Sequence, residues 1–124
     1  MPSPALRRNL GFAFGIALIV GGVLHGSGYA TVVPLVRNVD NDVKVIFPAL
    51  WVGFAWHYLI FGLLALSTAR SRPLLGLLTV VPLVDGITQV VYFGYSPSEI
   101  VLFTIAALGT AATLAHGDAV PTAR

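Results

Sequence analysis

Hydrophobic residues occupy long stretches of the chain, and charged residues are confined to short segments between them. Four stretches are long enough to cross a bilayer, and one of these is interrupted only by Asp85. A membrane-spanning helix needs about 20 predominantly apolar residues. The pattern therefore predicts an all-α, integral membrane protein of one domain over residues 1–124, with transmembrane helices at about 9–30, 46–69, 73–94 and 98–116.

The segments between the predicted helices are short. Residues 31–45 hold most of the polar loop content, residues 70–73 form a tight link, and residues 94–98 form a turn. Ser96 or Ser98 can cap the fourth helix. Because short links join antiparallel neighbours, we expect a four-helix up-down-up-down bundle in which successive helices are adjacent.

The basic residues predict an orientation. Arg7, Arg8, Arg70 and Arg72 fall on one side of the membrane, whereas Arg37 and Lys44 on the other side are offset by acidic residues. The positive-inside rule then places both termini in the cytoplasm, and the expected location is the cell membrane of a bacterium. An alternative remains for the first segment, because two arginines, an apolar stretch and Gly28-Tyr29-Ala30 are also typical of a cleaved signal peptide.

Composition narrows the function classes. Hydrophobic residues make up 56% of the chain and charged residues 10%, whereas a soluble domain is about 25% charged. The absence of cysteine excludes disulfides and thiolate metal sites. The net charge is +2, but the basic residues flank apolar runs instead of forming one patch, which argues against nucleic acid as a partner.

The first predicted helix carries glycines with a spacing of four residues, at Gly11 and Gly15 and again at Gly22 and Gly26. Small residues at this spacing allow helix backbones to approach closely in membranes. The glycines therefore predict a packing face, either within the bundle or between protomers of a homo-oligomer.

The third predicted helix carries a polar stripe, formed by Asp85, Thr88, Gln89 and Tyr92 at helical spacing. A carboxylate near the centre of a bilayer costs about 2.5–3.5 kcal/mol on the insertion scale. Asp85 should therefore face the interior of the bundle and find a partner there.

Depth counting names candidate partners. Asp85 lies 13 residues after Arg72 and His57 lies 13 residues before Arg70, so both should lie roughly 20 Å inside the membrane boundary. We expect a hydrogen bond between them, in which Asp85 orients His57 for proton transfer to a substrate. By the same count His25 lies level with Gln89. Candidate ligand contacts are His25, Gln89, Tyr29, Thr88, Tyr92 and Trp56.

These residues favour a polar cavity within the membrane that binds or converts a small lipophilic molecule. Whether the protein is an enzyme stays open. The first alternative is a structural or assembly subunit without chemistry, which the glycine faces favour. The lesser alternatives are b-type haem bound by His25, His57 or both, and proton-coupled transport through Asp85 and His57.

The layout resembles the small bacterial four-helix membrane proteins of the DoxX-like and related uncharacterised groups. The resemblance is carried by His25 after a glycine-rich first helix, by the Trp56-His57 pair in the second, and by the short arginine-containing link. It covers most of the chain and implies the four-helix bundle, but it implies no shared activity.

Overall fold

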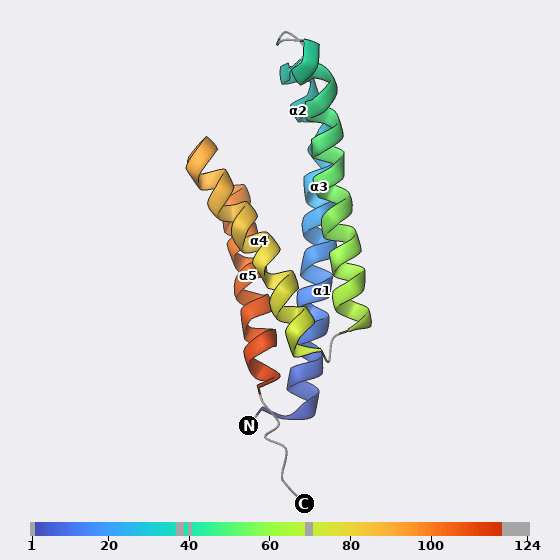
Figure 1. The fold of residues 1–124 in the computed structure, drawn as a ribbon, viewed down its shortest axis with the longest axis vertical. Helices are drawn as coiled ribbons and strands as arrows, with labels where there is room; N and C mark the ends of the chain where they lie inside the picture. The colour runs from blue at the N-terminus through green and yellow to red at the C-terminus, as the bar shows by residue number, and fades with distance from the viewer. Residues whose placement is uncertain (1, 37–38, 40, 69–70, 118–124) are drawn as a thin grey trace, which may run out of the picture.

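The computed structural model describes residues 2–36, 39, 41–68 and 71–117, and every regular element in these ranges is a helix. Four long helices, α1 (Pro4–Ser27), α3 (Asn41–Ser67), α4 (Arg72–Phe93) and α5 (Pro97–Ala115), form the body of the molecule. A short helix α2 (Tyr29–Val32) and the 3₁₀ turn η1 (Val33–Val36) follow α1 (Figure 1). By length and composition, each of the four long helices is sufficient to cross a membrane. The four predicted helices are thereby confirmed, and the chain has the features of a multi-pass membrane protein.

Two of the helices, α1 and α3, begin about one turn earlier than predicted, whereas α4 and α5 begin within one residue of the predicted position. The helix α1 begins at Pro4 because the Ser3 hydroxyl accepts a hydrogen bond from the Leu6 backbone N–H at 3.2 Å, and proline suits the first turn. The helix α3 begins at Asn41, so part of the predicted polar loop over 31–45 is helical. The length of an uncharged segment predicts the part of a helix that lies in hydrocarbon. It does not predict helical turns that continue beyond the hydrocarbon.

The start of α5 agrees with the prediction. Ser96 is the N-cap, Pro97 occupies the first position, and the Glu99 carboxylate accepts a hydrogen bond from the backbone N–H of Ser96. This reciprocal arrangement is a capping box, which satisfies backbone donors that have no partner within the helix.

The four long helices associate as two pairs, α1 with α3 and α4 with α5, and α1 also packs against α5. The pairs meet at the lower end of Figure 1 and diverge toward the upper end, where α2 and η1 lie. The helices α3 and α4 barely contact each other, although only a short link separates them in sequence. The prediction that these two helices are adjacent is therefore wrong, because close packing, and not link length, decides which faces meet.

Glycines explain why α1 selects α3. A Cβ atom at Gly62 would lie 2.8 Å from the Gly15 carbonyl oxygen and 2.5 Å from Ile19 Cγ1, and one at Gly22 would lie 2.9 Å from the Ala55 carbonyl oxygen. The two backbones can approach this closely only because these side chains are absent. Packing within the chain therefore accounts for Gly15 and Gly22.

The shared core lies where the two pairs meet. Gly109 on α5 leaves room for the ring of Phe14 from α1 and for the Thr79 hydroxyl from α4, and Phe14 is fully buried. Large apolar side chains elsewhere on the long helices are exposed, among them Ile16, Leu63, Leu77 and Val91. Exposed apolar side chains on every long helix are expected where hydrocarbon surrounds a protein.

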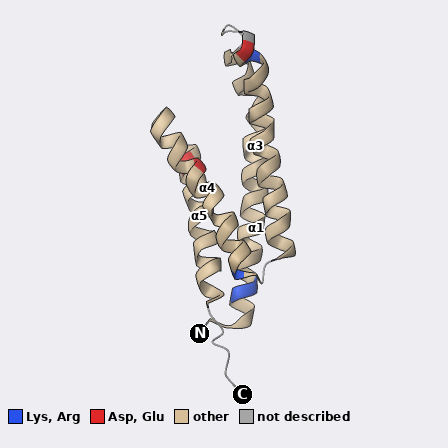
Figure 2. Cartoon of the chain, viewed as in Figure 1, with Lys and Arg blue, Asp and Glu red and all other residues tan. Residues whose placement is uncertain are grey.

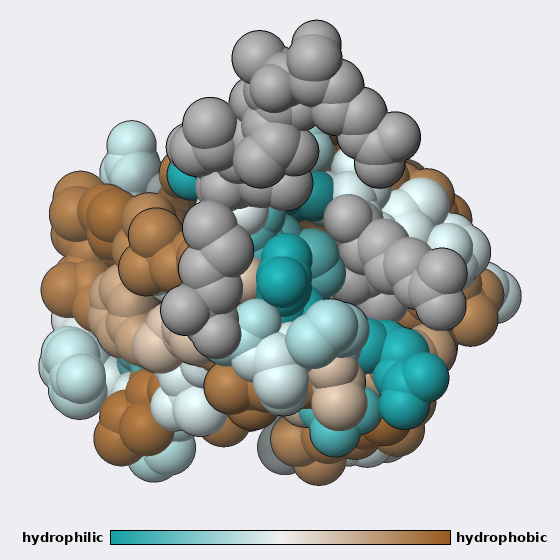
Figure 3. Space-filling model, turned by 90° about the horizontal axis from the view of Figure 1, so that it is seen from below, coloured by the Kyte–Doolittle hydropathy of each residue, from teal (hydrophilic) through white to brown (hydrophobic). Residues whose placement is uncertain are grey.

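Charged residues are concentrated at the ends of the molecule, with two exceptions inside it. Figure 2 shows basic residues at the lower end and the acidic residues of α4 and α5, which are Asp85 and Glu99, within the helical body. Seen from the lower end, hydrophilic residues gather near the middle and hydrophobic residues surround them (Figure 3). A hollow at this end is lined by Arg7, Arg8 and His116 together with Pro4 and Ala5.

Candidate functional site

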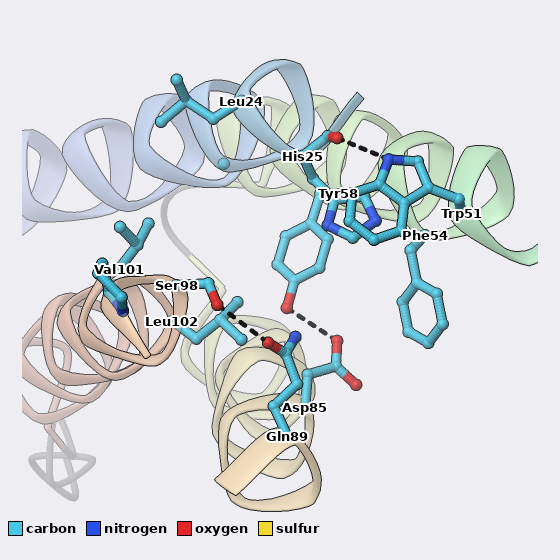
Figure 4. A pocket seen from close by; sticks show the side chains of 12 residues that line it. Leu24, His25, Trp51, Phe54, Tyr58, Asp85, Gln89, Ser98, Val101 and Leu102 are labelled. Atoms are coloured by element: carbon cyan, nitrogen blue, oxygen red, sulfur yellow. Dashed lines mark hydrogen bonds between the residues drawn. The ribbon is translucent and has the colours of Figure 1, made fainter. Parts of the chain in front are cut away.

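A pocket of about 330 Å³ lies between the two helix pairs, where they begin to diverge (Figure 4). All four long helices contribute to its walls. Its polar and aromatic lining consists of His25 from α1, Trp51, Phe54 and Tyr58 from α3, Asp85 and Gln89 from α4, and Ser98 from α5.

Asp85 is bound by a tyrosine. The Tyr58 hydroxyl donates a hydrogen bond to Asp85 Oδ2 at 2.8 Å, which connects α3 to α4 across the pocket (Figure 4). The Tyr58 side chain is only 4% exposed, and Asp85 is half-buried. The expectation that Asp85 turns inward and finds a partner is confirmed, but the partner differs from the predicted one.

His57 does not pair with Asp85. Its side chain is exposed, its ring lies 5.9 Å from that of Phe61 on the same helix, and it is not part of the pocket lining. The buried face of α3 follows Ala55, Tyr58 and Gly62, and each residue of a helix is rotated by about 100° from the one before. Counting residues from the arginines therefore came within one residue of the observed partner, Tyr58, but it did not predict which face of α3 points toward Asp85. The catalytic roles of His57 and Asp85 stay predictions.

His25 is held in the pocket wall by Trp51. The two rings stack with centroids 4.1 Å apart, and Trp51 Nε1 donates to the His25 carbonyl oxygen at 2.8 Å. The His25 Nε2 atom is buried and has no hydrogen-bond partner among the described residues. A buried polar atom without a partner costs about 1–3 kcal/mol.

Gln89 lines the same pocket as His25, in agreement with their predicted common level. The Ser98 hydroxyl donates to Gln89 Oε1 at 3.3 Å, which ties α4 to the first turn of α5. Glu99 is almost fully buried, but its carboxylate is used by the capping box and is not part of the lining.

The remaining predicted contacts lie outside the pocket. Thr88 and Tyr29 are exposed, as are Trp56 and Tyr92, and none of the four belongs to the pocket lining. The polar stripe of α4 is therefore divided, with Asp85 and Gln89 toward the pocket. Tyr92, in the last turn of α4, is 77% exposed.

Sequence reasoning missed Tyr58, Trp51, Phe54 and Ser98. The first three recur at intervals of three and four residues, which is the spacing of one helix face. This aromatic stripe contains Tyr58 and excludes His57, so it could have identified the partner of Asp85.

The positions of the histidine and acidic side chains bear on two of the alternatives, a bound metal ion and b-type haem, and haem held by a single histidine stays a prediction. The described residues contain no group of three His, Asp or Glu side chains that could hold a metal ion. His25 lines the pocket and His57 does not, so the two histidines do not face a common space.

Comparison of the chain with protein-family models, with curated proteins and with solved structures gave no match. The resemblance to DoxX-like groups therefore stays a prediction.

Proposed function

We propose that this chain is a multi-pass protein of a bacterial cell membrane that binds a small lipophilic molecule in the pocket between its two helix pairs. In this proposal the four long helices cross the bilayer in alternating directions, and both termini lie in the cytoplasm.

The convergence of His25, Asp85 and Gln89 on one pocket is the observation that supports the proposal. These three residues belong to the lining of the same pocket, in helices that are otherwise predominantly apolar. Polar groups within a membrane are costly and usually serve a function. A concave, mostly apolar space with a few convergent polar groups is the usual form of a small-molecule site, and pockets of about 300–1,000 Å³ are typical.

The position of the pocket suits a ligand that arrives through the bilayer. It lies between helix pairs that separate toward one end, so its surroundings are hydrocarbon in the proposed orientation. A lipophilic molecule partitions into that hydrocarbon and reaches the pocket from the side.

Filling the pocket tests the proposal. Leu24 lines the pocket and is 56% exposed, whereas its neighbour Val23 is 57% exposed and is not part of the lining. We expect Leu24→Trp to lose at least nine-tenths of a lipophile that co-purifies with the wild-type protein, and Val23→Trp to retain it. Extraction followed by mass spectrometry measures both.

The control in this experiment is the folded state, followed by circular dichroism and gel filtration in detergent. If the wild-type protein carries no lipophile and no small hydrophobic molecule raises its melting temperature, the binding proposal is wrong. Equal loss of ligand in both variants would place the site elsewhere.

A structural subunit is the second candidate. Its main support was the glycine spacing of the first helix, and contacts with α3 already use Gly15 and Gly22. We therefore rank ligand binding first. Homo-oligomer formation and conversion of the ligand stay predictions.

A further inference from the structure

We infer that the molecule bound in this pocket is a lipophilic amine in its protonated, cationic form. The inference rests on the proposed binding function and adds the chemical class of the ligand.

The charge of the pocket wall is the first argument. Asp85 is the one residue with a carboxylate in the lining, and no lysine or arginine from the described part of the chain lines the pocket. The Tyr58 hydroxyl donates to Asp85 Oδ2, and Oδ1 accepts no hydrogen bond from the described residues. A carboxylate in an apolar environment binds a cation strongly because water does not screen the attraction. The same charge repels fatty acids, phosphates and other anions.

Aromatic rings supply the second argument. Trp51, Phe54 and Tyr58 line the pocket from one face of α3, and the ring of His25 stacks on Trp51 (Figure 4). The faces of aromatic rings carry negative charge density and attract alkylated ammonium groups. Aromatic rings that line the same pocket as a carboxylate therefore suit a cation that also has apolar substituents.

The remaining polar atoms favour an ammonium group that has N–H donors. Gln89 Oε1 is an acceptor, and so is the second carboxylate oxygen of Asp85, Oδ1. A protonated amine has N–H groups that can donate to oxygens of these two lining residues. A quaternary ammonium ion has no N–H group to donate, so a protonated amine suits this lining better.

The test compares three probes of similar shape and different charge, namely phenylbutylamine, pentylbenzene and phenylbutyrate. The protein is placed in nanodiscs of zwitterionic lipid, and empty nanodiscs correct for partitioning. Trp51 lines the pocket and the other tryptophan, Trp56, is exposed, so a Trp56→Phe background lets Trp51 fluorescence report on the pocket. We expect phenylbutylamine to bind at least tenfold more tightly than pentylbenzene, and phenylbutyrate to bind more weakly than either.

The Asp85→Asn variant then tests whether the preference for the amine over the hydrocarbon depends on the charge of Asp85. It should bind phenylbutylamine and pentylbenzene within about twofold of each other, because the amide has a similar shape without the charge. If Asp85→Asn does not fold, the comparison of the three probes on protein with Asp85 intact still decides.

The two proposals fail in different ways. Equal binding of the amine and the hydrocarbon, or tighter binding of the anion, overturns the inference about charge and leaves the lipophile site intact. Retention of the full preference in Asp85→Asn also overturns it. Binding of none of the three probes contradicts both the inference and the proposed function.

Discussion

Among the described residues, Asp85 has a single hydrogen bond to a side chain, and that bond joins α3 to α4, which otherwise make few contacts. The donor is Tyr58, whose ring is also part of the buried core. Two neighbouring residues on α3 thus have opposite environments, since His57 is exposed and Tyr58 is buried. The sequence predicted the inward position of Asp85 from the cost of a charge in hydrocarbon. It could not identify the donor. Counting residues along the chain gives the depth of a residue in the membrane, but it does not give the helix face on which the residue lies.

Removal of the tyrosine hydroxyl measures the strength of this bond. We expect Tyr58→Phe to lower the free energy of unfolding by about 0.6–1.7 kcal/mol, which spans the average and the largest values for polar bonds between helices in membranes. Unfolding in mixed micelles of increasing SDS content gives the value.

The matched control is Tyr92→Phe, since the Tyr92 side chain is 77% exposed and is not part of the pocket lining. It should leave the free energy of unfolding within about 0.5 kcal/mol of wild type, as surface substitutions usually do. Equal effects of the two substitutions would show that the Tyr58 hydroxyl contributes nothing specific.

At the scale of elements, hydrophobic run length predicted the four helices. Two candidate caps, Ser96 and Ser98, predicted the start of α5, and Ser96 is the cap in the structure. Which helices contact each other was harder to predict from the sequence. The expected contact between α3 and α4 came from their short link, whereas the observed contact between α1 and α3 depends on glycines in both helices. The glycines of α1 marked it as a packing helix, but identifying its partner needed Gly62, which only the structure places opposite Gly15.

One added methyl group tests the contact between α1 and α3. A Cβ atom at Gly62 would meet the backbone of α1, so Gly62→Ala should destabilise the protein by about 1–3 kcal/mol, as overpacking does. Thermal unfolding in detergent, monitored by circular dichroism, should show a lower melting temperature.

Gly53 on the same helix has nothing within 4 Å of the position of an added Cβ atom, and Gly53→Ala is the control. Alanine is the better helix former, so this variant should be as stable as wild type or more so by up to about 1 kcal/mol. A Gly62→Ala protein as stable as Gly53→Ala would mean that the two backbones are not in close contact.

For the whole molecule, α1 begins and α5 ends at the lower end, and α2 and η1 lie at the upper end (Figure 1). The proposed orientation places the lower end in the cytoplasm because Arg7, Arg8 and Arg72 are there. Since the chain has no cysteine, each introduced cysteine is the only thiol and reports on one end alone.

Labelling of intact cells with a membrane-impermeant maleimide tests this orientation. Leu35→Cys, at a side chain in η1 that is 73% exposed, should react in intact cells. Pro2→Cys should react only after permeabilisation. The reverse pattern would invert the orientation, and reaction of both in intact cells would contradict an alternation of ends across the bilayer.

The hydrogen bond from Tyr58 to Asp85 connects two helix pairs that meet at their lower end and diverge above it. An ammonium group that bonds to Asp85 Oδ1 would keep this connection, whereas one that takes the place of the Tyr58 hydroxyl would remove it. We therefore expect the separation of the two pairs to depend on which oxygen of Asp85 a ligand uses.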